Sequence, residues 1–266
     1  MAIIPDDARC MFHLTHSLVL FVGTVVLLGC HNESPHLTNT ARLLNNEQQN
    51  GHQNEQQAEA DASSAEAPLA EQIQNVLQGD DDRVLVTAEV TDSRLANVPQ
   101  LDGLRELLLD GGSIQGEGLQ PPSRWPNLRH LRLRYSPIDD QGLQLISQMK
   151  SLQIVNLPQA RCTDAGIECL AALPDLRQLR LASPLATSDI CKPISKLTSL
   201  RSLHLIDIPV DDNGLMLLAD LPDLQSLYLD NAAVSDSGWT KLFDRKPGLH
   251  VHIDQRHHDL DPAKHP

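Results

Sequence analysis

A repeat of fixed length constrains the fold of this chain more than any other feature. Leucine recurs every 24 residues without an insertion, at Leu104, Leu128, Leu152, Leu176, Leu200 and Leu224. Each of these leucines opens a segment of the same pattern, and the clearest copy is LRHLRLRYSPIDDQGLQLISQMKS. Self-similarity at a period of this length predicts a solenoid, in which each repeat packs only on its neighbours.

Two hydrophobic periodicities follow one another within each repeat. The fourth and sixth positions are apolar, as in Leu131 and Leu133, which predicts a short strand with one buried face. Later positions are apolar at a spacing of three, as in Leu143 and Ile146, which predicts a helix. Asp, Ser or Thr precedes that helix, for example at Asp139, where it can cap the free N–H groups. Each repeat is therefore expected to be a strand, a turn and a helix.

The L-x-x-L-x-L segment and the following I/V-D/S-D-x-G segment resemble leucine-rich repeats. They are similar to the 24-residue repeats of bacterial proteins and to the cysteine-containing repeats of F-box substrate receptors. The resemblance covers about residues 80–254. It implies an α/β fold, a right-handed leucine-rich repeat solenoid with a parallel β-sheet on the concave face and helices on the convex face. About eight parallel strands are expected, with those at 131–133, 155–157 and 179–181 adjacent to one another.

The repeat pattern also sets the expected domain boundaries. A leucine-rich repeat domain is expected at 67–254, made of a capping helix (67–79, with Leu69, Ile73, Val76 and Leu77 as its apolar face), a degenerate first repeat (80–103), six full repeats (104–247) and a terminal strand (248–254). Residues 255–266 are polar and are expected to form a frayed tail.

The N-terminal segment has the character of an export signal. Residues 17–29 form an apolar run, which is shorter than the roughly 20 residues that a membrane-spanning helix needs. A run of this length predicts a secretory signal peptide at 1–29. The residues Leu27-Leu28-Gly29-Cys30 resemble a bacterial lipobox, which implies cleavage before Cys30 and attachment of lipid to it. Two alternatives remain open at this point: an uncleaved anchor, or a simple signal peptide with a coincidental cysteine.

The residues on either side of this run bear on its interpretation. The segment before it holds one basic residue, Arg9, and translation from Met11 instead of Met1 would remove it. The segment after it, residues 30–66, is rich in Asn, Gln, Glu and Ser and predicts a disordered tether. The lipobox and the tether together imply a protein of the cell envelope, anchored through lipid on the periplasmic or extracellular side.

Strand side chains that point away from the core provide the candidate binding site. Odd strand positions face away from the core, and they carry Arg, Tyr and His, types that include the common hot-spot residues of interfaces. The expected binding set on the concave face is Arg132, Arg134, Tyr135, Arg180, His204, Tyr228 and His252. The acidic residues Asp110, Asp230 and Asp254 are expected to form a rim that orients a partner. A solvated stripe without a binding role is the alternative.

The histidines near the C-terminal end of the repeats and two of the cysteines are candidates for a metal site and for a disulfide. His250 and His252 lie on the same side of a strand and precede Asp254, His257 and His258, a set that suits zinc. Because half of this set falls in the predicted tail, the sequence favours exposed histidines and no metal. Cys162 and Cys191 replace apolar residues of the repeat and are expected to be buried thiols, with a bridge between them as the alternative.

The remaining sequence favours binding over catalysis. No common catalytic motif or phosphate-binding glycine loop is present, so neither catalytic residues nor a cofactor are expected. The net charge of −14 disfavours nucleic acid as a partner. We therefore expect a monomeric, non-enzymatic protein that binds a protein or an anionic ligand. Two alternatives remain: a subunit resembling the substrate receptors of ubiquitin ligases, and an enzyme whose site has no recognisable motif.

Overall fold

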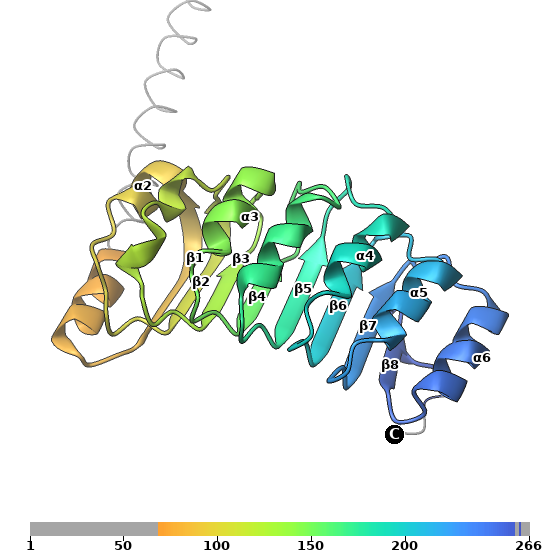
Figure 1. Cartoon of the computed structure of the whole chain (residues 1–266). Coiled ribbons are helices and arrows are strands. Elements are labelled where there is room, and N and C mark those ends of the chain that lie inside the picture. Colours follow the sequence, from red (N-terminus) through yellow and green to blue (C-terminus); the bar gives the residue numbers. More distant parts are fainter. Residues whose placement is uncertain (1–68, 259–260, 262–266) are drawn as a thin grey trace, which may run out of the picture. The chain divides into compact units, whose positions relative to one another are not determined.

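One β-sheet organises the computed structural model, which describes residues 69–258 and 261 (Figure 1). Strands β1 to β8 are parallel and hydrogen-bonded in sequence order, which confirms the predicted parallel sheet and the adjacency of its central strands. The strands are β1 (Arg83–Thr91), β2 (Glu106–Ser113), β3 (His130–Leu133), β4 (Ile154–Leu157), β5 (Gln178–Ala182), β6 (Ser202–Ile206), β7 (Ser226–Asp230), β8 (His250–Ile253) and β9 (Arg256–His257).

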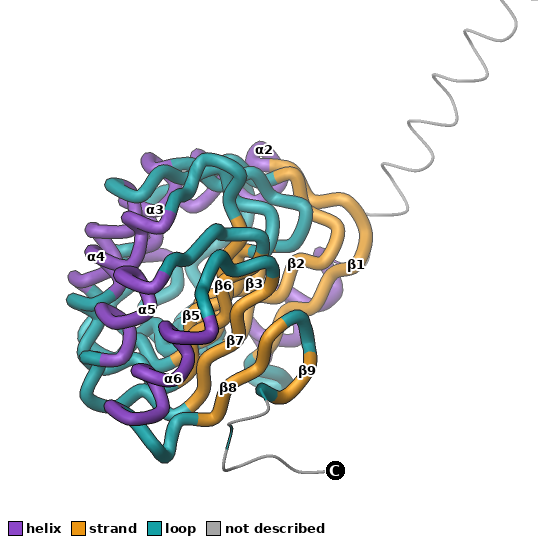
Figure 2. Tube along the Cα trace, turned by 90° about the vertical axis from the view of Figure 1, so that its right-hand side faces the viewer, coloured by secondary structure: helices purple, strands orange, loops and turns teal. Residues whose placement is uncertain are grey.

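Helices cover one face of this sheet (Figure 2). After a first helix at residues 69–78, the α-helices among the described residues are α2 (Asp92–Ala96), α3 (Asp140–Ile146), α4 (Cys191–Ile194), α5 (Asp212–Ala219) and α6 (Asp236–Arg245). Short 3₁₀ helices replace or extend them at η1 (Glu117–Leu119), η2 (Pro122–Arg124), η3 (Gly166–Ala172) and η4 (Ser188–Ile190). Each full repeat thus contains the expected helical segment, but in some repeats it is a 3₁₀ helix and not an α-helix. In the repeat that starts at Leu104, Pro121 and Pro122 lack the N–H groups that a continuous helix needs.

The core is a set of leucine columns between the sheet and the helices. The strand register places Val155 beside Leu179, and Leu157 beside Leu181. Leu157 and Leu181 are fully buried, and the apolar cluster continues from Leu69 to Val251. Because each strand adds the same two inward residues, every repeat covers the apolar surface of the one before it.

The paired aspartates of the turns have two different structural roles. The first of each pair caps its own helix, since Asp139 accepts a hydrogen bond from the Gly142 N–H at 2.9 Å. The second bonds to the next repeat, and Asp140 accepts from both the N–H and the hydroxyl of Thr163 at 2.8 Å. A side chain at Gly166 would overlap the Asp140 carboxylate and displace it from its bonds to Thr163. The pairs thus act in capping, as predicted, and also in joining repeats.

A buried arginine supports the first repeats, which the sequence analysis did not predict. Arg124 is only 8% exposed, and its guanidinium donates to the carbonyl oxygens of Leu95, Ala96, Val98 and Gly118 at 2.5–3.1 Å. These acceptors include the Ala96 carbonyl at the end of α2, where the last carbonyls of a helix need donors. Burial lowers the pKa of Arg124 from its ordinary value.

Both ends of the described chain differ from the sequence expectations. A helix covers residues 69–78 and buries Leu69 and Val76, but Leu77 is 52% exposed because it lies beside the apolar stripe and not on it. A frayed tail was expected from residue 255, but its first residues are ordered, because Arg256–His257 forms β9, antiparallel to β8. Within residues 69–258, no helix is both long and apolar enough to cross a bilayer. The signal peptide, Cys30 and the tether lie outside the described residues.

Candidate binding face

One face of the sheet lies opposite the helices and is left uncovered (Figure 1). A column of polar and aromatic side chains runs across this face. Strand pairing aligns the column residue by residue, in the order Arg132, Asn156, Arg180, His204, Tyr228 and His252. Each of these side chains is half-buried, whereas its neighbours along the same strand point into the core or lie at the end of the strand. The predicted set is therefore brought together on one surface, with Arg134 and Tyr135 at the end of β3.

Arg132 is not a free cation on this face. Its Nη2 lies 2.7 Å from Asp110 Oδ2, and Arg134 Nη1 lies 4.0 Å from the same oxygen. Asp110 lies at one end of the column and neutralises the arginines of the next strand, a pairing that the sequence analysis did not predict. The same holds for Asp230, whose Oδ2 lies 2.8 Å from His204 Nε2. Asp254 is exposed in the β8–β9 turn and accepts a hydrogen bond from the Asn231 N–H.

Arg180 occupies the centre of the column without an ionic partner. Among residues 69–258 and 261, no carboxylate oxygen lies within 4.0 Å of its guanidinium. Its Nε is buried with no hydrogen-bond acceptor in the described chain, and the neighbouring Asn156 Oδ1 is buried without a donor. Both line a groove of about 260 Å³, which also includes Arg132, His204 and Tyr228. Unsatisfied polar atoms are costly when buried, so this groove is suited to a polar occupant.

Two further hollows lie beside the column, at opposite ends of the strands. At the amino ends, Arg177 and Arg201 line a polar hollow of about 560 Å³ together with glutamine and serine side chains. At the carboxyl ends, Tyr135, Pro158 and Ile206 line a more apolar hollow of about 570 Å³. The face thus combines a central polar groove with a basic side and an apolar side.

Tyr135 is held in an unusual backbone conformation at the apolar hollow. Its φ of 56° is in the left-handed region, which bulky residues rarely adopt. The corresponding position of two later repeats carries Asp207 and Asn231, residue types that tolerate this conformation. Tyr135 is 63% exposed, and its N–H donates to Gln159 Oε1 at 2.9 Å. Such strain is often found at functional sites.

Comparison with known proteins agrees with this geometry. A family model described as Leucine Rich repeat matches residues 126–147. That segment begins just before β3 and ends after α3, and the rest of the sheet repeats its pattern in register. This is a leucine-rich repeat protein. The curated proteins contain no match to its sequence.

Several solved structures are similar to this leucine-rich repeat protein at low sequence identity. Internalin C2 of Listeria monocytogenes is 20% identical over 65% of this chain and 80% of its own, with a TM-score of 0.47. An internalin, inlF, of the same organism is 22% identical over 70% of this chain and 55% of its own, with a TM-score of 0.49. A leucine-rich repeat protein of Leptospira interrogans is 20% identical over 64% of this chain and 48% of its own, with a TM-score of 0.45.

The described cysteines of this leucine-rich repeat protein are free thiols. Cys162 and Cys191 are buried in the core and form no bridge, so that alternative was wrong. Burial, together with nearby aspartates, raises the pKa of each of these two thiols to about 12. A thiol is nucleophilic only when it is deprotonated, so both remain inert packing groups at neutral pH.

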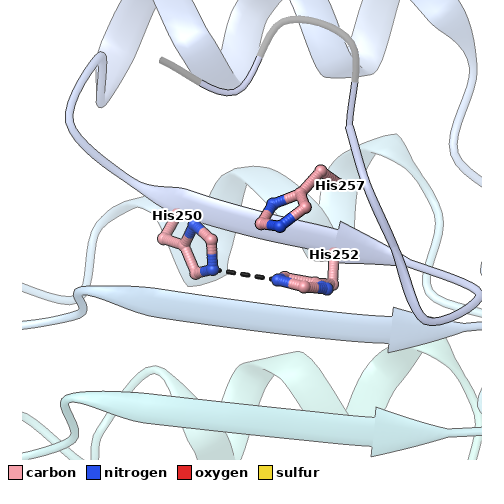
Figure 3. A group of neighbouring side chains, drawn as sticks. All are labelled: His250, His252 and His257. Carbon is pink, nitrogen blue, oxygen red and sulfur yellow. Dashed lines mark hydrogen bonds between the residues drawn. The ribbon is translucent and has the colours of Figure 1, made fainter. Parts of the chain in front are cut away.

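The last column residue, His252, is part of a cluster that the sequence analysis divided between strand and tail. His250 and His252 point from β8 toward His257 on β9 (Figure 3). The ligand nitrogens of these three residues all lie within 4.8 Å of one another. The carboxylate beside them is Asp261, not the Asp254 that the sequence indicated. The spacing of His250 and His252 was a usable signal, but the β8–β9 turn that adds His257 was not recognised.

Proposed function

We propose that this leucine-rich repeat protein is a non-enzymatic module that binds an acidic segment of a partner protein on the uncovered sheet face. The observation that carries the proposal is the central groove, where the Arg180 guanidinium has no carboxylate partner in the described chain. A carboxylate from a partner would satisfy Arg180 through paired hydrogen bonds, which a planar guanidinium forms well.

The dimensions of the face favour a protein over a small ligand. The polar groove and the two flanking hollows extend over strands β3 to β7. Tyr228 and Tyr135 supply aromatic surface beside the arginines, and this combination is typical of interface hot spots. Asp110 and Asp230 flank the groove and disfavour an acidic segment placed off-centre, which helps to set the register of the partner.

A photo-cross-linking experiment tests where a partner binds. A photoreactive phenylalanine analogue at Ala182 would lie on the uncovered face, two residues from Arg180 along β5 and on the same side of that strand. The same analogue at Lys241, exposed on α6, serves as the control on the helical face. We expect irradiation in envelope extracts to give a discrete adduct from position 182 and none from position 241. Adducts from position 241 alone would place binding on the helical face and reject the proposal.

We further propose that the protein acts from the outer side of a membrane, held by lipid on Cys30. The apolar run at residues 17–29 and the lipobox-like residues before Cys30 support this location. The polar segment that follows, up to residue 66, has the composition of a flexible tether. Such a tether lets the repeat domain reach a partner at some distance from the bilayer.

Replacement of Cys30 tests the anchor. Cys30→Ser removes the only atom that a thioether-linked lipid can attach to at this position, so we expect incorporation of labelled fatty acid to be lost. Ser replacement at Cys10, which precedes the apolar run, is the matched control and should leave the label unchanged. Equal labelling of the Cys30→Ser variant and the parent would rule out the lipid anchor.

A further inference from the structure

We propose that His250, His252 and His257 form a binding site for a zinc-class divalent metal ion at the C-terminal end of the sheet. Two of these histidines alternate on β8, and the third comes from β9 through the turn at Asp254 and Gln255. The register pairs His252 directly with His257, and His250 lies two residues from His252 on the same side of β8 (Figure 3). Three imidazoles from two adjacent strands therefore converge on one point.

The distances within the cluster fit a metal site. The Nε2 atoms of His250 and His252 are 2.9 Å apart, and all three ligand nitrogens lie within 4.8 Å of one another. Nitrogen ligands of tetrahedral zinc are separated by about 3.3 Å, as follows from a Zn–N bond of roughly 2.0–2.1 Å. The observed separations, from 2.9 Å to at most 4.8 Å, bracket that value. Imidazole is a preferred ligand of zinc and of similar transition metals.

Asp261 supplies the outer shell that such sites need. Its Oδ2 lies 2.9 Å from His250 Nδ1 and 3.4 Å from His257 Nδ1. A carboxylate that accepts from Nδ1 leaves Nε2 of the ring for a metal, a role that Asp261 is close enough to take for His250 and His257. The Asp261 side chain is fully buried, and its Oδ2 also accepts a hydrogen bond from the Val251 N–H at 3.2 Å. A buried carboxylate requires nearby positive charge, which a divalent ion on neutral imidazoles would provide.

The site would join β8, the strand at the end of the parallel sheet, to β9, which covers its outer edge. β9 pairs along the free edge of β8, which otherwise would expose unpaired backbone groups. Metal coordination across β8 and β9 would hold this closure in place. Three protein ligands leave a fourth position of a tetrahedral ion for water or for an outside donor. The site adjoins the binding face, since the rings of His252 and Tyr228 lie 4.8 Å apart.

Zinc titration of the metal-stripped full chain, in competition with a chromophoric chelator, tests the site. We expect the parent to bind one Zn²⁺ more than the variant with His250→Ala, His252→Ala and His257→Ala. His257→Ala alone should weaken that binding at least about 100-fold, and Asp261→Asn about 10- to 100-fold. His258→Ala is the matched control, because His258 packs on Trp239 and Phe243 outside the cluster and should leave binding unchanged.

A spectroscopic readout separates a metal site from histidines that only pack together. Co²⁺ in a tetrahedral three-histidine site should give strong visible absorption in the parent and in His258→Ala, but not in the triple variant. Amide exchange at Val251 should slow on addition of Zn²⁺ in the parent and in His258→Ala but not in the triple variant, because coordination would hold Asp261, which accepts from the Val251 N–H, in place. Equal Zn²⁺ stoichiometry and affinity in the parent and the triple variant would overturn the proposal, and so would Co²⁺ spectra of an octahedral ion only.

Discussion

Leu157→Ala is expected to lower the free energy of unfolding of the repeat domain by about 2–5 kcal/mol. Leu157 is fully buried at the end of β4, and the register places it beside Leu181 of the next repeat. Its removal leaves a cavity between two repeats that only partly collapses. In a solenoid each repeat is held by its neighbours, so a cavity at a central interface weakens both sides of the stack.

Urea unfolding followed by circular dichroism measures this loss. Leu185→Ala is the matched control, because Leu185 is 47% exposed and its truncation removes the same atoms from a solvated position. We expect the control to change the free energy of unfolding by less than about 0.5 kcal/mol. If Leu157→Ala costs no more than Leu185→Ala, the core does not pass through β4 as the structure places it.

The fold was predictable because the repeat contains redundant information. Leu131, Val155 and Leu179 occupy the same position of successive repeats, so one periodicity predicted both the strands and their neighbours. The column from Arg132 to His252 followed from the same register. Because each position recurs in several repeats, an error at one residue would not have changed the predicted parallel sheet.

Contacts that differ from one repeat to the next were not predictable. The Asp110–Arg132 pair depends on side-chain rotamers across two strands, which a sequence pattern does not specify. The four bonds of Arg124 depend on the path of the chain after α2. The approach of His257 and Asp261 to β8 depends on a single turn at Asp254, where no repeat pattern remains. Tertiary context decides each of these contacts, and the 24-residue period contains no information about them.

The partner is expected to lose most of its affinity for the Arg180→Glu variant. Arg180 is the column cation with no carboxylate within 4.0 Å in the described chain, so its charge is available to a partner. Reversal places a carboxylate against the acidic segment that we propose to bind there. Loss of one member of a desolvated charge pair costs about 2–5 kcal/mol, a decrease in affinity of at least about 30-fold. Binding assays with the cross-linked partner, once it is identified, measure this loss.

Three comparisons make the result specific to the guanidinium of Arg180. Arg180→Lys keeps the charge but lacks the planar fork, so it should recover only part of the affinity. Arg132→Glu should have a smaller effect, because Asp110 already neutralises Arg132 in the free protein. Lys241→Glu makes the same charge change on α6 and should leave affinity unchanged. Affinity of the parent should also fall as salt rises. Equal affinities of the parent and the folded Arg180→Glu variant would show that the partner binds elsewhere.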